Sequence, residues 1–466
     1  MAKRGLRRNF LMKNTKVLVE ELEQGKYDSV LLDLYVDAEK LDYQRKRYIE
    51  TIKKYEETFG EGEVEIYSAP GRSEVGGNHT DHQHGMVLAT SINLDALAVV
   101  GASKDENIHV MSEGYDMVDV EIDDLEARHE EEGTTAALIR GVTADLKGKG
   151  YEVKGFQAYV TSDVLIGAGL SSSAAFEVIV GTILSGMFND EKIDPVVIAQ
   201  SGQFAENVYF GKPCGLMDQM ACSVGGMIHI DFKNPEEPVV EKVPSDFEAY
   251  QYSLCIVDTK ASHADLTDDY AQIPADMKKV AKFFKKNFLR EVPEEEFYNQ
   301  ISAMRGLLGD RPVLRAIHFM EEETRVQKEV DSLKAGDFKG FLELVKESGN
   351  SSFKYLQNVY TINDLNQQAV SVALAGSERI LGKHGVCRVH GGGFAGTIQA
   401  FVENDGQSIW TWFLSGIKST SKRRGKSSRI RNIIFRIFTK KKCTKDFKKW
   451  SKSRKIRKKL STFYCG

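Results

Sequence analysis

The sequence predicts an α+β protein with two domains, a helical N-terminal extension and a C-terminal tail of different character. At 466 residues the chain is too long for one ordinary hydrophobic core. Hydrophobic residues make up 41% and charged residues 28% of it, as in most globular proteins. Short strand patterns mix with groups of helical patterns, which argues against a doubly wound sheet.

Membrane and export signals are not expected in this sequence. No apolar stretch is long enough to span a bilayer, and polar residues 13–16 interrupt what would have to be the apolar core of a secretory signal. The six cysteines are sparse and form no Cys-x-x-Cys pair, which is typical of thiols in a reducing compartment. We therefore expect a cytoplasmic protein with no membrane partner.

The N-terminal half begins with an amphipathic helix over residues 44–60, where apolar side chains recur every three or four positions. The patterns after it are, in order, a strand at 64–67, a polar loop at 69–82, a buried strand pair at 86–100 and a strand at 155–162. A glycine- and serine-rich run at 167–175 then opens a helix that extends to residue 188, and a further helix covers 195–208.

The C-terminal half mixes strands with a long helical region. Its patterns are strands at 227–232 and 252–258, several antiparallel helices between 275 and about 350, and strands at 387–390 and 397–402 on either side of a glycine run at 391–396. The predicted divisions are a helical extension at 1–60, domains at 61–240 and 241–405, and a tail at 406–466.

The glycine- and serine-rich run is the strongest chemical signal in the chain. Glycines let the backbone approach a ligand closely, and three serines offer hydroxyls and N–H groups where a helix begins. A helix N-terminus carries about half a positive charge, so the run suits an anion such as a triphosphate. Ordinary helix capping needs one serine, and no lysine follows as in a Walker A loop. The predicted phosphate-binding residues are Gly167, Gly169, Leu170, Ser171, Ser172 and Ser173.

Two acids and one arginine are candidates for phosphoryl-transfer chemistry. Such an enzyme needs a carboxylate on Mg²⁺ and an anion near the attacking hydroxyl. Glu206 and Asp218 lie on either side of the glycine-containing turn 211–215, and Arg72 follows Pro-Gly in the polar loop. The chain has 67 acids, so only the surrounding motif distinguishes these two.

The polar loop offers short side chains that suit sugar hydroxyls, among them Asn78, His79 and Asp81. Another interpretation is a metal cluster of His79, His82 and His84, although the spacing matches no standard zinc pattern. The segment 262–265, Ser-His-Ala-Asp, is triad-like only in sequence, because triad members meet in space.

Three of these segments together resemble the galactokinases of the GHMP (galacto-, homoserine, mevalonate and phosphomevalonate) kinase superfamily. Residues 70–81 look like the galactokinase sugar signature, 167–175 are similar to the superfamily's phosphate loop, and 389–396 look like its third, glycine-rich motif. The resemblance covers residues 30–405 and implies a two-lobed α+β fold with the active site in the cleft between lobes. It also implies transfer of the γ-phosphoryl group of ATP to the anomeric hydroxyl of galactose, with Mg²⁺ as cofactor.

The resemblance assigns roles to particular residues. Asp218 matches the catalytic aspartate, and Arg72 matches the arginine that pairs with it and stabilises the transferring phosphoryl group. Glu206 matches the glutamate that binds Mg²⁺, and Ser173 matches the serine that shares the ion. The positions that match sugar contacts are Asn78, His79, Asp81, Gly215 and Tyr270.

Two substitutions set the sugar signature apart from the family. Asn78 stands where galactokinases have a glutamate that contacts the sugar, and Glu74 stands where they have an asparagine. An amide tolerates a carboxylate or a missing hydroxyl on the sugar better than glutamate does, because the charge repulsion is gone. Galactose is the expected substrate, and galacturonate, arabinose and N-acetylgalactosamine are alternatives.

The tail differs sharply in composition from the rest of the chain. Residues 406–466 hold 20 Lys and Arg against one acid, a balance of +19, and all three tryptophans. Galactokinases continue here with a helix and a final strand, which the tail does not resemble. We interpret it as the product of a frameshift near residue 405, which would leave the final strand missing.

Two other functional classes compete with a kinase. Nucleic-acid binding rests on the basic tail alone, without a recognised nucleic-acid module. A non-catalytic sugar sensor, as some galactokinase relatives are, would be favoured by loss of the phosphate loop or of the catalytic aspartate, and the sequence has both.

Overall fold

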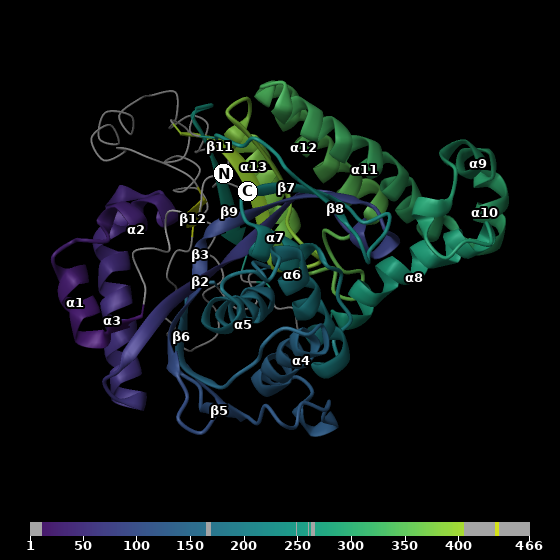
Figure 1. Cartoon of the computed structure of the whole chain (residues 1–466). Helices are drawn as coiled ribbons and strands as arrows, with labels where there is room; N and C mark the ends of the chain where they lie inside the picture. The colour runs from purple at the N-terminus through teal and green to yellow at the C-terminus, as the bar shows by residue number, and fades with distance from the viewer. Residues whose placement is uncertain are drawn as a thin grey trace, which may run out of the picture.

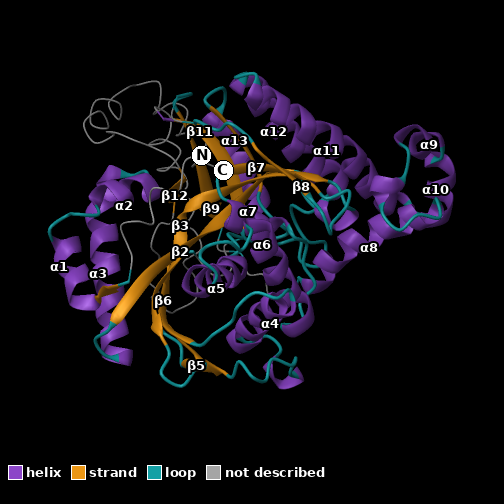
Figure 2. Cartoon of the chain, in the orientation of Figure 1, coloured by secondary structure: helices purple, strands orange, loops and turns teal. Residues whose placement is uncertain are grey.

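The computed structural model describes residues 12–164, 169–247, 249–259, 261 and 266–404, together with the backbone of 434–437. Two sheets run through the middle of the molecule with helices on both sides of them (Figures 1 and 2). This arrangement confirms the predicted α+β class.

The larger sheet has eight strands in the order β1-β2-β3-β6-β4-β5, and β7 and β8 continue it from β3. Within it β4 pairs with β6 in parallel, and the other described pairs are antiparallel. Its strands are β1 (Lys13–Asn14), β2 (Glu63–Gly76), β3 (Met86–Ala102), β4 (Ile108–Ser112), β5 (Met117–Val120), β6 (Phe156–Ser162), β7 (Met227–Asp231) and β8 (Val239–Lys242).

The smaller sheet is antiparallel, with the order β10-β11-β9-β12. Its strands are β9 (Tyr252–Asp258), β10 (Gly385–Val389), β11 (Thr397–Glu403) and β12 (Ile434–Ile437). β12 belongs to the basic tail, and its backbone pairs with β9 from Ile434 opposite Val257 to Ile437 opposite Leu254. The tail thus contributes a strand to this sheet, which its composition does not predict.

The helices form four groups around the sheets (Figure 1). The group at the N-terminal end is α1 (Thr15–Glu23), α2 (Asp28–Tyr35) and α3 (Leu41–Phe59); the next is α4 (Thr135–Gly148), α5 (Ser172–Phe188), α6 (Pro195–Phe204) and α7 (Met217–Val224). A long helical arm follows with α8 (Thr267–Phe283), α9 (Glu294–Asn299), α10 (Ile301–Leu308), α11 (Asp310–Lys334) and α12 (Phe338–Ser351), and α13 (Ala369–Leu381) packs on the smaller sheet. None of the helices in the described part of the chain could cross a membrane.

Two strands differ from their sequence predictions because of how they pair. The predicted loop at 69–82 is strand as far as Gly76, since β2 stays hydrogen-bonded to β3 through two register shifts, at Pro70/Arg72 and Glu74/Gly76. The predicted strand pair at 86–100 is the single strand β3. β3 pairs with β2, and in addition its first half pairs with β7 and its second half with β6. One strand thus has three partners.

The helix predicted at 195–208 ends earlier, at Phe204. A π-helical turn, η5 (Ala205–Tyr209), follows it, and π turns of this kind are frequent at functional sites. The predicted helix at 44–60 is confirmed as α3, whose Tyr48, Ile52 and Tyr55 are buried on the larger sheet.

One hydrophobic cluster joins the two sheets. It contains Val75 and Leu88 of the larger sheet, Leu254 and Phe401 of the smaller one, and Val330 of α11. Because the two halves pack on this common core, the second half of β2, the start of α5, η5, α7 and the glycine run 391–396 are held close together.

Candidate active site

Arg72 and Asp218 form a bidentate ion pair, although they are 146 positions apart in the sequence. Arg72 Nε donates to Asp218 Oδ1 at 2.7 Å, and Nη2 donates to Oδ2 at 2.8 Å. Arg72 lies on β2 and is buried, whereas the Asp218 side chain, in the first turn of α7, is 33% exposed. The arginine therefore supports the carboxylate from inside and leaves its outer side accessible.

The pKa of Asp218 lies below its ordinary value. Removal from water by itself would raise this pKa, but the charge and hydrogen bonds of Arg72 lower it more, and the Ser171 hydroxyl adds to this. Asp218 is therefore an anion at neutral pH and only a weak base.

The predicted phosphate loop is connected to the same arginine. Arg72 N donates to Leu170 O at 3.2 Å, and Arg72 Nη1 donates to Gly169 O. Ser171, at the N-cap of α5, has a left-handed backbone with φ of 57°, and its hydroxyl donates to Asp218. The N–H groups at the start of the 17-residue helix α5 thus open beside Asp218, where an anion is favoured. Gly167 lies outside the described residues.

Glu206 and Ser173, the predicted metal ligands, are in contact. Ser173 Oγ donates to Glu206 Oε1 at 3.2 Å. Gln219 Nε2 holds the other carboxylate oxygen, Oε2, at 2.9 Å, and is itself 2.9 Å from Glu177 Oε2. Lys212 Nζ caps Oε1 at 2.7 Å.

A hydroxyl and a carboxylate are hard oxygen donors, which fit Mg²⁺. In the described part of the chain no three His, Cys, Asp or Glu side chains gather as a metal site. A Mg²⁺ ion shared with nucleotide phosphates needs only one or two carboxylates from the protein, so the Ser173–Glu206 pair is a sufficient donor set.

Asp81 and Gly215 meet on the side of Asp218 where the predicted sugar residues lie. Asp81, in the 3₁₀ turn η3 (Asp81–Gln83), accepts the His82 N–H at 2.9 Å. Its carboxylate fills the space that a Cβ on residue 215 would take. Gly215 is three residues before Asp218, so this contact brings the sugar loop next to the aspartate.

Three successive carbonyls of the glycine run 391–396 bind predicted sugar residues. Gly391 O accepts from Asn78 Nδ2 at 2.8 Å, Gly392 O is 3.1 Å from His79 Nε2, and Gly393 O accepts from the Tyr270 hydroxyl at 2.9 Å. Because a carbonyl only accepts, His79 carries its proton on Nε2. Burial lowers the pKa of His79 to about 3, so this ring is neutral.

The Asn78 side chain is enclosed by the protein. Its side chain is fully buried, its Nδ2 also donates to Glu74 Oε1 at 2.9 Å, and its Oδ1 accepts from Ser352 Oγ at 3.2 Å and Asn358 Nδ2 at 2.8 Å. Both ends of the amide are thus used inside the protein, because β2 and the glycine run enclose it. In this arrangement Asn78 supports the loop and offers no group to a sugar.

Glu74, a hydrogen-bond partner of Asn78, forms a buried pair with an arginine of the smaller sheet. Glu74 accepts from Arg388 Nη2 of β10 at 2.8 Å, and both side chains are at most 3% exposed. Burial raises the pKa of Glu74 to about 7, although the charges of Arg388 and Arg72 oppose this. The pair joins the two sheets directly beneath the sugar loop.

Sequence reasoning missed Glu177, Gln219, Lys212 and Arg388. Gln219 follows Asp218 in the sequence, and Lys212 lies in the turn 211–215. Their position next to predicted site residues could have identified both. Glu177 and Arg388 lie in apolar segments, and the only signal for them is a charge at a buried helix or strand position.

The alternative metal and triad interpretations gain no support. The His84 ring stacks on Phe288 with centroids 3.5 Å apart, and His79 binds the glycine run. Residues 262–265 lie outside the described part of the chain.

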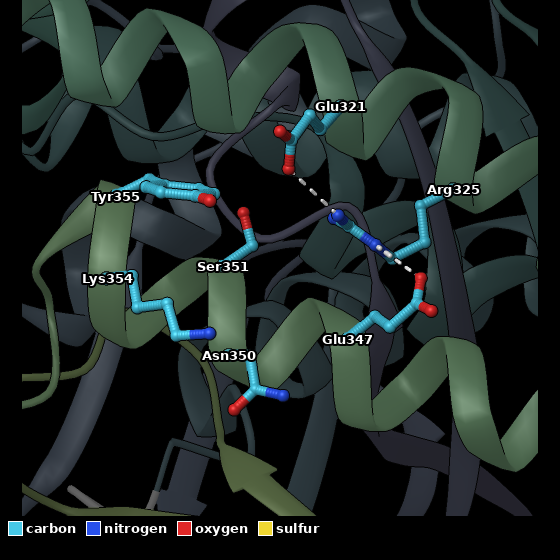
Figure 3. Close-up of a pocket in the computed structure, with 7 residues that line it drawn as sticks. All are labelled: Glu321, Arg325, Glu347, Asn350, Ser351, Lys354 and Tyr355. Carbon is cyan, nitrogen blue, oxygen red and sulfur yellow. Dashed lines mark hydrogen bonds and ion pairs between the residues drawn. The ribbon is translucent and has the colours of Figure 1, made fainter.

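A separate pocket of about 230 Å³ lies between α11, α12 and the π turn η7 (Ser352–Leu356) (Figure 3). Across it Arg325 pairs with Glu321 at 3.2 Å and Glu347 at 3.9 Å. Arg325 also pairs with Glu322, whose Oε1 accepts the Gly77 N–H at 3.1 Å. The lining residues are Glu321, Arg325, Glu347, Asn350, Ser351, Lys354 and Tyr355. The pocket is therefore connected to the sugar loop through Glu322, and the predicted sugar residues do not line it.

Two family models and several known proteins match this chain. Residues 53–102 match the family description "Galactokinase galactose-binding signature", and residues 137–226 match "GHMP kinases N terminal domain". The chain is 32% identical to a galactokinase of Thermotoga maritima over 71% of this chain and 87% of that protein, and 30% identical to one of Streptomyces coelicolor over 76% and 88%.

A solved structure has the same fold. The crystal structure of Lactococcus lactis galactokinase complexed with galactose is 25% identical and has a TM-score of 0.68, with 79% of this chain and 93% of that chain covered. A mevalonate kinase structure, at 15% identity and a TM-score of 0.54, shares the fold. The paired Arg72 and Asp218, the phosphate loop and these relatives lead to one conclusion: the chain belongs to the galactokinase family of the GHMP kinases.

Proposed function

We propose that this chain transfers the γ-phosphoryl group of ATP to the anomeric hydroxyl of galactose. The observation that carries the proposal is the position of Arg72. Its guanidinium holds both oxygens of Asp218 and also the Gly169 carbonyl of the phosphate loop. An acceptor hydroxyl near Asp218 would therefore lie close to an anion bound at the start of α5.

Positioning and charge dominate the proposed mechanism. Asp218 accepts a hydrogen bond from the attacking hydroxyl and orients it, and its lowered pKa makes strong proton abstraction unnecessary for a loose transition state. Arg72 keeps Asp218 ionised and places a fixed positive charge beside the transferring group. The N–H groups from Ser171 to Ser173 hold the phosphates.

The Ser173 hydroxyl and the Glu206 carboxylate would hold a Mg²⁺ ion. When bound, such an ion neutralises charge on the nucleotide phosphates. Gln219 and Glu177 keep Glu206 in place, because the amide fixes Oε2 and leaves Oε1 toward Ser173.

The proposed sugar site consists of Asp81 beside Gly215 and of His79 and Tyr270 on the glycine run. The Asp81 carboxylate suits two neighbouring hydroxyls, and the neutral His79 adds a ring with no charge to repel or attract the substrate. Galactose is favoured because the relatives over most of the chain are galactokinases.

The test is a comparison of sugars with the product identified. The protein is incubated with ATP, Mg²⁺ and galactose, galacturonate, arabinose or N-acetylgalactosamine, and ³¹P NMR locates the new phosphate. We expect the largest kcat/KM for galactose and phosphate on the anomeric oxygen only. Phosphate on another hydroxyl, or binding of galactose without any turnover, would contradict the proposal; the second result would favour a sugar sensor.

A further inference from the structure

Lys212 occupies a position that the proposed reaction does not explain. It follows η5 in the segment Gly211-Lys212-Pro213, and its N–H donates to Glu206 O at 3.0 Å. The backbone is therefore anchored to the turn that carries the proposed metal ligand. The side chain is 63% exposed, whereas that of Glu206 is 4% exposed, so the ammonium lies on the solvent side of a buried carboxylate.

The ammonium uses the same oxygen as the proposed metal site. Glu206 Oε1 receives both Lys212 Nζ at 2.7 Å and Ser173 Oγ at 3.2 Å, while Oε2 is occupied by Gln219. A divalent cation shared by Ser173 and Glu206 would therefore need the oxygen that Lys212 now holds. Two positive groups this close repel each other, so a bound divalent cation favours the departure of Lys212 from Glu206.

Lys212 can move without disturbing the fold. Its stem has four rotatable bonds, and an ammonium is a point charge that binds anions from many directions. Ser173, its neighbour at Oε1, belongs to the first turn of α5, where the phosphates would bind. Lys212 and Ser173 share Glu206 Oε1, so the exposed ammonium lies close to the start of α5.

We propose that Lys212 is a phosphate-binding residue that alternates between two anions. Without nucleotide it neutralises Glu206. When a divalent ion takes Glu206, Lys212 turns to the phosphate oxygens of the nucleotide. This rests on the proposed function, since it assumes that a metal–nucleotide complex binds at α5.

The test measures binding without turnover, in Lys212→Gln, Lys212→Arg and the wild-type chain. Lys192→Gln is the matched control, because Lys192 is an exposed lysine in an ion pair of 2.9 Å with Asp190, just beyond α5. Mn²⁺ binding to the nucleotide-free protein is followed by electron paramagnetic resonance, and ADP binding in the presence of saturating Mg²⁺ by calorimetry. We expect Lys212→Gln to bind Mn²⁺ about tenfold more tightly and ADP about tenfold more weakly, the scale of one charged hydrogen bond.

Lys212→Arg keeps the charge and should stay within about threefold of the wild type in both measurements, as should Lys192→Gln. An unchanged Mn²⁺ affinity, or an unchanged ADP affinity, in Lys212→Gln would overturn the proposal. If the wild-type chain itself binds neither ADP nor Mn²⁺, the proposed function fails as well. If the wild-type chain binds both and Lys212→Gln leaves either affinity unchanged, only the proposal for Lys212 fails.

Discussion

Asp81 keeps its place in the site because residue 215 has no side chain. Its carboxylate lies where a Cβ of residue 215 would be, and it is the far end of a short side chain that can rotate away. An added methyl group there should therefore move the carboxylate and leave the fold intact.

We predict that Gly215→Ala lowers kcat/KM for galactose by roughly 10- to 150-fold, the loss of one charged hydrogen bond to the substrate of about 1.5–3 kcal/mol. The KM for ATP should change by less than about threefold, and the thermal midpoint should fall by no more than a few degrees. Steady-state kinetics with each substrate varied checks this.

Gly148→Ala is the matched control, since no atom lies near the Cβ position of Gly148 in α4. A Gly215→Ala enzyme with an unchanged galactose KM and kcat would show that Asp81 does not contact the sugar.

The sequence predicted those site residues that belong to a short local motif. Arg72, Asp218, Glu206 and Ser173 lie in short patterns with a clear chemical purpose, and the structure brings them together. The buried position of Asn78 was not predicted, because its partners, Asn358 and Gly391, are about 300 positions away. No local pattern contains that information.

The junction of β2 with β10 places a titratable group between two sheets. Glu74, on β2, is buried against Arg388 of β10 and has a pKa of about 7, whereas an unfolded glutamate has a pKa near 4.3. Between these values the folded chain keeps a proton that the unfolded chain loses. Stability from this group is therefore lost as the pH rises.

We predict that this loss is absent in Glu74→Gln, whose amide still accepts from Arg388. From pH 5 to pH 8 the free energy of unfolding of the wild type should fall by about 3 kcal/mol relative to that of the variant. Urea unfolding of both proteins at the two pH values measures the difference.

Glu343→Gln controls for the loss of one negative charge, because Glu343 is 71% exposed on α12. If the free energies of unfolding of the wild type and Glu74→Gln differ by the same amount at pH 5 and at pH 8, the raised pKa of Glu74 is contradicted.

The strands β2 and β3 were harder to predict than the helix α3. α3 has a strong period and was found within a few residues. β2 and β3 were divided or shortened because their polar and irregular halves look like loops. The pairing of β3 with β2, β6 and β7 shows that β3 is one continuous strand. Such pairing between distant segments cannot be read from a short stretch of sequence.

The whole molecule combines two sheets on one hydrophobic core, with the candidate site where they meet. The boundaries at 60, 240 and 405 remain predictions, and the shared cluster indicates that the two halves depend on each other. The frameshift origin of residues 406–466 is still a hypothesis that resequencing of the locus would test. β12 shows that this tail contributes backbone to the smaller sheet, which its composition did not predict.

The catalytic role of Asp218 is the central claim, and Asp218→Asn tests it most directly, with Asp190→Asn as a control at an exposed aspartate. The turnover of galactose is measured by ADP release and ATP binding by calorimetry. The account predicts a fall in kcat of about 10²- to 10⁴-fold with ATP affinity within a few fold of the wild type, and no change in the control. An Asp218→Asn enzyme that turns over galactose at the wild-type rate would contradict it.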